Sequence, residues 1–195
     1  MAEPVRVQAL TERYLHGALS ISNKFVGAGR KRLCCLIPLS LLPTPMSEFK
    51  KLYATEDSLS ASAVAVRESD DKVVGFVQMT DASMKRDPFG KCLHPSCEGE
   101  CYIEMMSVLP EMRGQGIGTR LLQFCETWAR ERGAHKLTLG VVARNPAKHL
   151  YERFGFVECE SNTASACCNS LCVFFLLGFP HWGCGATMMA KNLLS

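Results

Sequence analysis

The sequence lacks any hydrophobic run long enough to cross a membrane. A membrane-spanning helix needs roughly 20 apolar residues, whereas the strongest apolar runs here cover only residues 36–42 and 171–179. The first residues also lack the pattern of a secretory signal, which is a basic segment followed by an apolar one. We therefore expect no membrane span and a cytoplasmic location, with the nucleus as the alternative.

The sequence has little excess of either charge. Its 22 basic and 19 acidic residues give a net charge of +3, and so even a balance produces no strong field toward nucleic acid. We expect no nucleic-acid partner. Hydrophobic residues make up 47% and charged residues 21% of the chain, which favours a globular protein over a disordered one. The length predicts one domain spanning residues 1–195.

The eleven cysteines do not form the framework of a small disulfide-rich protein. Their number is odd and several stand in apolar runs, so we interpret most of them as reduced, buried side chains. Thiolate and imidazole are preferred zinc ligands, but the first cluster contains no CxxC pair, and we expect free thiols and no metal. The first cluster consists of Cys92, His94, Cys97 and Cys101, and the second of Cys167, Cys168, Cys172, His181 and Cys184.

Hydrophobic periodicity in the first half of the chain predicts strands and one helix. Residues 61–66 and 73–79 flank an acidic turn at residues 68–71, which predicts a β-hairpin. Residues 6–10 predict a short strand, and Thr11 is positioned to cap a helix that follows it.

The second half of the chain alternates between strand and helix patterns. An apolar strand over residues 102–109 ends at a proline, and the amphipathic helix that begins near Ile117 ends at Gly133. Further strands are predicted over residues 137–141, 156–160 and 187–193. The predicted inner stripe of the helix is Ile117, Leu121, Leu122, Cys125, Trp128 and Ala129. This order of elements predicts an α/β sheet layered with helices.

A second, shorter helix is predicted between two of these strands. Asn145 is a suitable N-cap, and the proline in the first helical position loses nothing by having no N–H. The predicted inner stripe of this helix is Ala147, Leu150, Tyr151 and Phe154.

Two stretches without this periodicity are interpreted as insertions. Residues 81–100 are rich in Pro, Gly, Lys, Asp and Cys, and residues 161–185 form the other inserted segment. The apolar run of the second insertion, residues 171–177, predicts either a core strand or an exposed patch that docks a partner, a second subunit or a membrane surface, and residues 171–182 are the candidate partner-binding segment. A homodimer interface is among these alternatives.

Glycines alternate in a loop that joins the strand at residues 102–109 to the amphipathic helix. Such a loop exposes backbone N–H groups, and the start of a helix adds unpaired amides and the positive end of its dipole. These features favour an anionic phosphate, and Arg113 and Arg120 would add charge. The loop has neither the Lys-Ser/Thr pair of a Walker A motif nor the glycine spacing of a dinucleotide site. A tight, well-packed connection is the alternative interpretation.

Two segments carry a family resemblance, and they read VLPEMRGQGIGTRLL and NPAKHLYERFGF. In the first, two residues separate Arg113 from the Gly-x-Gly of Gly116 and Gly118. In the second, Asn145 begins a helix on which Tyr151 lies. Both segments, in this order and spacing, resemble the motifs of the GCN5-related N-acetyltransferase (GNAT) family. The resemblance covers about residues 73–159.

The resemblance implies an α/β fold with a mixed, mostly antiparallel, twisted sheet of six to seven strands flanked by helices. The sheet would splay open between the strand before the glycine loop and the strand at Leu137, and the pantetheine arm of acetyl-CoA would lie in this gap. Backbone groups near Ser107 and Val108 would bond the arm. The amides expected to hold the pyrophosphate belong to Gly114, Gln115, Gly116, Ile117, Gly118 and Thr119.

The same resemblance suggests roles for four side chains. Tyr151 matches the family tyrosine that protonates the CoA sulfur, although it is also suited to pack on its helix stripe. Glu104 is the preferred base for the incoming ammonium, and Tyr102, two residues earlier on the same side, is the alternative. Either residue has a structural role as its other interpretation. Asn145 would contact CoA or only cap its helix.

The sequence therefore predicts an enzyme, an N-acetyltransferase that moves an acetyl group from acetyl-CoA to a primary amine by direct attack in a ternary complex. Acetyl-CoA is the co-substrate, and no metal is expected. The acceptor stays open among a protein α-amine, a lysine side chain and a small-molecule amine. A catalytically silent acyl-CoA-binding or partner-binding module on the same fold is the alternative function.

Overall fold

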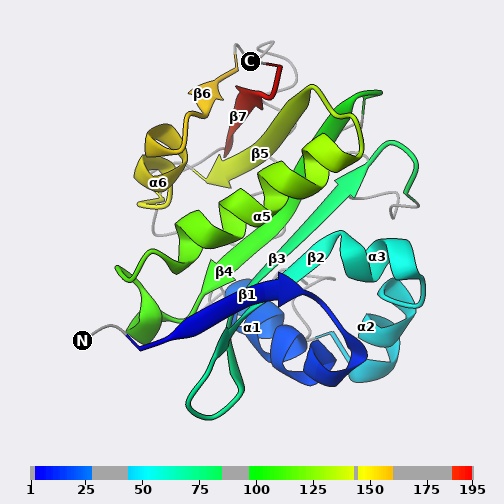
Figure 1. Ribbon diagram of the computed structural model, residues 1–195, viewed down its shortest axis with the longest axis vertical. Helices are drawn as coiled ribbons and strands as arrows, with labels where there is room; N and C mark the ends of the chain where they lie inside the picture. Colours follow the sequence, from blue (N-terminus) through cyan, green and yellow to red (C-terminus); the bar gives the residue numbers. More distant parts are fainter. Residues whose placement is uncertain (1–2, 28–43, 85–96, 143–144, 160–185, 195) are drawn as a thin grey trace, which may run out of the picture.

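The computed structural model describes residues 3–27, 44–84, 97–142, 145–159 and 186–194. Their framework is a seven-stranded sheet in the order β1-β2-β3-β4-β5-β7-β6 (Figure 1). All neighbouring strands pair antiparallel except β4 and β5, which are parallel. The predicted mixed, mostly antiparallel sheet of six to seven strands is confirmed.

The strands are β1 (Val5–Ala9), β2 (Ser62–Arg67), β3 (Lys72–Asp81), β4 (Glu100–Val108), β5 (Lys136–Val142), β6 (Val157–Glu158) and β7 (Ala186–Asn192). The helices are α1 (Leu15–Gly27), α2 (Met46–Leu52), α3 (Glu56–Ser60), α5 (Ile117–Glu131) and α6 (Lys148–Arg153), with short 3₁₀ turns η1 (Glu12–Tyr14) and η2 (Pro110–Met112).

The sheet carries helices on both faces. An added Cβ at Gly75 would touch Ile117 and Leu121, so this position of β3 faces α5. The neighbouring Phe76 packs its ring against Phe49 of α2, and successive strand residues point to opposite faces. Helix α5 therefore covers one face, and α1 and α2 lie against the other (Figure 1).

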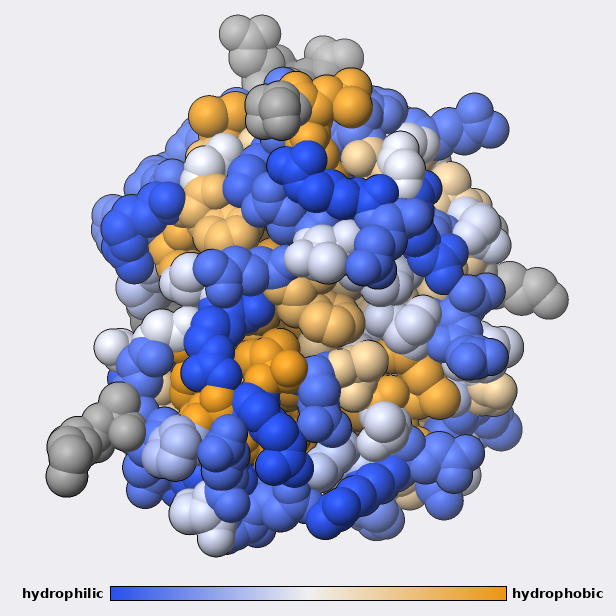
Figure 2. Space-filling view, in the orientation of Figure 1, coloured by the Kyte–Doolittle hydropathy of each residue, from blue (hydrophilic) through white to orange (hydrophobic). Residues whose placement is uncertain are grey.

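The amphipathic pattern of α5 predicted its packing correctly. The buried residues of the helix are the six that the sequence placed on its inner stripe, and Gly133 follows the helix with a positive φ of 72°. Hydrophilic side chains cover most of the face that carries α5, with smaller apolar areas between them (Figure 2). None of the described helices is long and apolar enough to span a bilayer.

Three predicted details are corrected by the structure. Thr11 makes no capping hydrogen bond with its side chain, because a 3₁₀ turn precedes α1 and the helix itself begins at Leu15. The strand predicted over residues 156–160 shortens to the two residues of β6. Helix α6 begins at Lys148 rather than at Pro146, and its N-cap is Ala147 rather than Asn145, whose side chain instead accepts the amide of Ala147 in the turn before the helix.

Strands β4 and β5 pair along only part of their lengths. The ladder runs from Glu100 opposite Lys136 to Ile103 opposite Leu139, while β4 continues to Val108. Beyond Ile103, β4 stays paired with β3 on its other side. The described β4–β5 ladder therefore ends at Ile103 while β4 runs on for five residues, as the predicted splay requires.

A β-bulge lies in β4 at Glu104. Gln78 is opposite Met105 and Met79 is opposite Ile103, so Glu104 is the extra residue between them. Bulges re-aim side chains and are frequent beside active sites. In a regular ladder Glu104 would be opposite Met79, on the other face from Gln78. The bulge instead brings Glu104 to the face that carries Gln78.

Candidate active site

The glycine loop, which we define as residues 113–119, leads from η2 into α5. Gly114 and Gly116 both have φ of +76°, a left-handed conformation that side chains disfavour. A Cβ added at either glycine would meet no atom within 4 Å. The loop therefore combines an unusual backbone with open space beside it.

The backbone amides of this loop are available as hydrogen-bond donors. Arg113 donates its amide to Pro110, and the next helical bond is from Arg120 to Gly116. No amide from residue 114 to residue 119 has a backbone acceptor among the described residues. Because α5 is 15 residues long, the positive end of its dipole adds to these donors. The side-chain Oε1 of Gln115 is also buried there without a hydrogen-bond partner in the described part of the chain.

The two arginines of this region have different surroundings. Arg113 is exposed, and its Nε donates to the carbonyl of Val108 at 3.2 Å. Arg120 instead turns to β1, where its guanidinium donates to the carbonyl of Val5. Of the two charges predicted to assist the loop, Arg113 thus lies at the end of β4, whereas Arg120 links α5 to β1.

Successive residues of β4 direct their backbone hydrogen-bonding groups alternately toward β3 and away from it. This alternation decides which groups face the gap beside β5. Leu109 donates to the carbonyl of Val74 at 2.9 Å, and neighbouring residues of an antiparallel strand bond to opposite sides. The N–H and C=O of Ser107 therefore point toward β3. Those of Met106 and Val108 point toward the gap, so the alternation favours this pair over Ser107 as backbone contacts for a ligand there.

Helix α6 packs against the start of α5 and carries Tyr151. Asn145 Oδ1 accepts the amide of Ala147 at 3.0 Å in the turn that precedes this helix. A Cβ added at Gly118 would approach Leu150 Cδ2 to 2.8 Å, so glycine allows the first turn of α5 to pack closely on α6. Tyr151 is 7% exposed and packs edge-to-face on Phe156.

The phenol of Tyr151 is held in its protonated form. Burial raises its pKa to about 12, and the nearby thiol of Cys125 adds to this effect. A neutral phenol at every physiological pH is available to donate a proton rather than to accept one.

The bulged Glu104 belongs to a hydrogen-bonded group on the other face. Gln78 Nε2 donates to Glu104 Oε2 at 2.9 Å, and the Tyr53 hydroxyl donates to Gln78 Oε1 at 2.7 Å. Tyr102 is opposite Thr80, two residues from Gln78, so it shares this face. Its hydroxyl lies 3.2 Å from a Cβ built on Gly140 of β5. We call Tyr53, Gln78, Tyr102 and Glu104 the Glu104 cluster.

The structure thus brings the predicted residues together in two groups. The glycine loop lies between the end of β4 and α5, and α6, which carries Tyr151, packs its Leu150 against Gly118, while Glu104 and Tyr102 lie on the face covered by α1 and α2. Two members of the Glu104 cluster were missed from the sequence. Gln78 is the polar residue in the otherwise apolar stretch 73–79 of β3, which was a usable signal, but nothing local marks Tyr53.

No group of three or more potential metal ligands occurs within the described part of the chain. From the first cysteine cluster, Cys97 is exposed and Cys101 is buried in β4. Cys92 and His94 lie outside the described residues, as do the second cluster and the apolar segment 171–182 with its predicted interface.

An open mixed sheet with a glycine-lined helix start beside a splayed strand pair is the arrangement that the two GNAT-like motifs predicted. The sequence pattern of the acetyltransferase (GNAT) family matches residues 36–156. The chain therefore belongs to this family, and the resemblance seen in its two motifs is confirmed.

Individual relatives include acetyltransferases with different acceptors in their names. Over 110 residues the chain is 46% identical to streptothricin acetyltransferase of Streptomyces lavendulae, covering 56% of this chain and 51% of that protein. It is 32% identical over 127 residues to N-alpha-acetyltransferase 30 of Schizosaccharomyces pombe, covering 65% of this chain and 76% of the relative. The chain thus spans about half the length of the first relative.

Solved structures support the fold. The structure of yncA from Salmonella typhimurium with its cofactor acetyl-CoA superposes with a TM-score of 0.63 at 18% identity, covering 98% of this chain and 95% of that one. At this identity the likeness concerns the fold alone.

Proposed function

We propose that this protein is an N-acetyltransferase that moves an acetyl group from acetyl-CoA to a primary amine by direct attack in a ternary complex. The observation that carries this proposal is the glycine loop. Its amides from residue 114 to residue 119 lack a backbone acceptor among the described residues, and they lie beside two positive-φ glycines with open space around them. Membership of the family supports acetyl-CoA as the donor.

The donor side of the site would hold acetyl-CoA through backbone groups. The amides of residues 114–119 suit a pyrophosphate because they combine hydrogen-bond donors with the dipole of α5. Met106 and Val108 would bond the pantetheine arm from the part of β4 beyond its described ladder with β5. Asn145 Oδ1 already accepts the amide of Ala147. Only its Nδ2 would therefore be available to bond the coenzyme.

Acetyl-CoA supplies the activated thioester, and the chain supplies the proton transfers. Tyr151 would give its proton to the departing sulfur, since its raised pKa keeps the phenol neutral. Glu104 would take the proton of the acceptor ammonium directly or through water. Tyr102, on the same face, is the alternative base, and the bulge at Glu104 favours the carboxylate.

The acceptor would be an amine that arrives as a cation. The relatives' names give a small molecule, streptothricin, and a protein α-amine as two such acceptors. A carboxylate on the face of the sheet that α1 and α2 cover suits either of them, because an opposite charge attracts the ammonium before it is deprotonated.

The test is release of the CoA thiol from acetyl-CoA in the presence of an amine panel. The panel contains streptothricin, peptides with a free α-amine, their N-terminally blocked lysine counterparts and a polyamine. One class should raise thiol release well above the rate without acceptor. Saturable acetyl-CoA binding without turnover on any acceptor would instead identify a silent binding module, and absence of binding would refute the donor assignment.

A further inference from the structure

A chain of hydrogen bonds ends on the carboxylate proposed as the base. Tyr53, at the end of α2, donates to Gln78 on β3, and Gln78 donates to Glu104 on β4. The distances are 2.7 Å and 2.9 Å. The two hydrogen bonds thus link three elements of the fold in one direction, from a phenol through an amide to a carboxylate.

The direction of this chain fixes the amide of Gln78. A carboxamide has one accepting end and one donating end. Because the hydroxyl of Tyr53 donates to Oε1, the donating Nε2 faces Glu104 Oε2. A charge-assisted hydrogen bond of this kind is stronger than a neutral one. Tyr53 is suited to the role, since burial raises its pKa, and the charge of Glu104 raises it further against the lowering effect of a hydrogen bond with Ser62.

The ring of Tyr53 is fixed by aromatic packing. It is 4% exposed, and its centroid lies 4.7 Å from that of Phe49 and 6.4 Å from that of Phe76. Its backbone amide also closes the last turn of α2 by donating to Lys50. The hydroxyl therefore has little freedom to leave Gln78.

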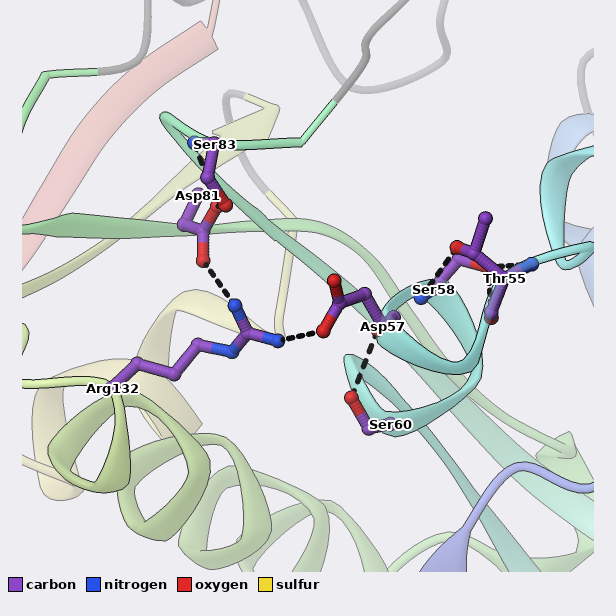
Figure 3. Close-up of polar contacts among 7 residues, drawn as sticks. All are labelled: Thr55, Asp57, Ser58, Ser60, Asp81, Ser83 and Arg132. Atoms are coloured by element: carbon purple, nitrogen blue, oxygen red, sulfur yellow. Dashed lines mark hydrogen bonds and ion pairs between the residues drawn. The ribbon is translucent and has the colours of Figure 1, made fainter.

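The chain just after Tyr53 is held by a second set of contacts (Figure 3). Thr55 and Ser58 form a capping box at the start of α3. Asp57 of α3 accepts from Arg132 at 2.6 Å, and the same guanidinium donates to Asp81 at 3.2 Å. Arg132 thus joins α3 to the ends of α5 and β3, which anchors the segment that carries Tyr53.

We propose that Gln78 is a positioning residue that orients and stabilises the Glu104 carboxylate, and that Tyr53 sets the orientation of the Gln78 amide. This inference rests on the proposed function in giving Glu104 the role of base. It adds a specific dependence of that base on two residues that do not themselves take up the proton.

Other titratable groups near this face are few within the described elements. Tyr53 from α2 lies near the Glu104 charge. Tyr102 and the buried Glu100, both of β4, share this face, and the Glu100 carboxylate accepts a hydrogen bond from Thr138 of β5. The charged or titratable side chains of α1 and α2 are exposed instead of turned toward the sheet; these are His16, Lys24, Glu48, Lys50 and Lys51.

The first test replaces the amide with an apolar group of similar shape, Gln78→Met. Loss of a hydrogen bond to a charged carboxylate should lower kcat about tenfold and move the acidic limb of the pH–rate profile up by about one pH unit. The KM for acetyl-CoA should not change. Tyr53→Phe should shift the acidic limb in the same direction by a smaller amount. The Gln78 amide is still present in this variant and loses only the hydrogen bond that orients it.

A matched control is Gln123→Met on the exposed side of α5. It makes the same chemical change away from the Glu104 cluster and should leave the rate and its pH profile unchanged. A Gln78→Met enzyme whose profile matches that of the wild type and of this control overturns the proposal, even if its thermal stability has fallen.

A second readout does not depend on turnover. The Glu104 carboxyl is titrated by carbon-13 NMR, with its signal assigned by its loss in Glu104→Gln. The titration midpoint of Glu104 should rise in Gln78→Met. It should rise further in Gln78→Glu, because a second carboxylate then lies beside that of Glu104. The Gln78→Glu variant also provides the test if Gln78→Met does not fold.

The two readouts separate the failures. If the wild-type protein transfers no acetyl group, the proposed function fails, and the NMR midpoint still shows whether Gln78 stabilises the carboxylate. If the wild type is active but neither the midpoint nor the rate profile moves in the Gln78 variants, the positioning role is wrong. A midpoint that moves without the rate profile also overturns it, because Glu104 would then not be the base that Gln78 serves.

Discussion

The glycine loop and the Glu104 cluster differ in how the chain builds them. The loop is one continuous segment, and its groups are backbone amides whose positions follow from local glycines and a helix start. The hydrogen-bonded part of the cluster joins side chains that are 25 and 26 residues apart in sequence. A backbone site is thus encoded locally, whereas a side-chain site depends on strand register and on helices packed over the sheet.

The two regions should also respond differently to substitution. The loop tolerates side-chain changes that keep its backbone, because its donors are amides. The cluster depends on particular side-chain atoms and on the bulge that turns Glu104 toward Gln78. Substitutions in and around each region therefore test whether backbone and side-chain sites differ in this way.

The largest expected effect is that of Tyr151→Phe, which removes the phenol hydroxyl from α6 and leaves the backbone of the glycine loop unchanged. We expect kcat to fall about a hundredfold, because the departing sulfur loses its proton donor, while the acetyl-CoA affinity measured by calorimetry stays nearly constant. Tyr14→Phe is the control, since Tyr14 is a buried tyrosine that bonds Asp71 at 2.9 Å. Equal losses of rate and affinity in Tyr151→Phe would mean that the ring only packs.

The next effect tests whether the loop acts through its backbone. Gly116→Ala should weaken coenzyme A binding at least about tenfold, because a Cβ enters the open space beside the amides and the left-handed φ is strained. Gly133→Ala is a matched control at the other end of α5, with a φ of 72° and the same open surroundings. Both variants should lose about 1 kcal/mol of stability from strain. Similar coenzyme A affinities in the two variants would contradict the assignment of the loop.

A smaller effect is expected at the anchor of the cluster. Arg132→Gln removes the bridge from α3 to β3, and its guanidinium also lies 4.6 Å from the ring centroid of Trp128. We expect a loss of about 1 kcal/mol in the free energy of unfolding, with coenzyme A affinity unchanged. Arg153→Gln, at an exposed position in α6, should have almost no effect. A loss of coenzyme A binding in Arg132→Gln would show that the two regions are not independent.

The smallest effect is the pH dependence of stability. Burial raises the pKa of Cys101 to about 11 and that of Tyr151 to about 12 in the folded protein. Folding therefore keeps these protons when the unfolded chain loses them, and this contribution is present below about pH 9 and declines as the pH rises toward the folded-state pKa values. Denaturant titrations should show the decline. The decline in the free energy of unfolding with pH should be shallower in Cys101→Ala. An unchanged slope in this variant would show that the Cys101 thiol does not contribute to the decline.

Local patterns were sufficient to predict much of the fold. The inner stripe of α5, the β2–β3 hairpin and the stop at Gly133 each depend on a periodicity or on one glycine, and the structure contains all three. Thr11 shows where such patterns fail. Its residue type suits a cap, but a 3₁₀ turn intervenes before α1 and the side chain makes no capping bond.

The glycine loop and the amphipathic helix behind it could be predicted from the residues alone, because glycine conformation and helix periodicity act within a few positions. The bulge at Glu104 and the approach of Tyr53 to Gln78 became visible only in the folded chain. Strand register and helix docking join segments that are far apart in sequence, and no short stretch of residues specifies which side chains they bring together.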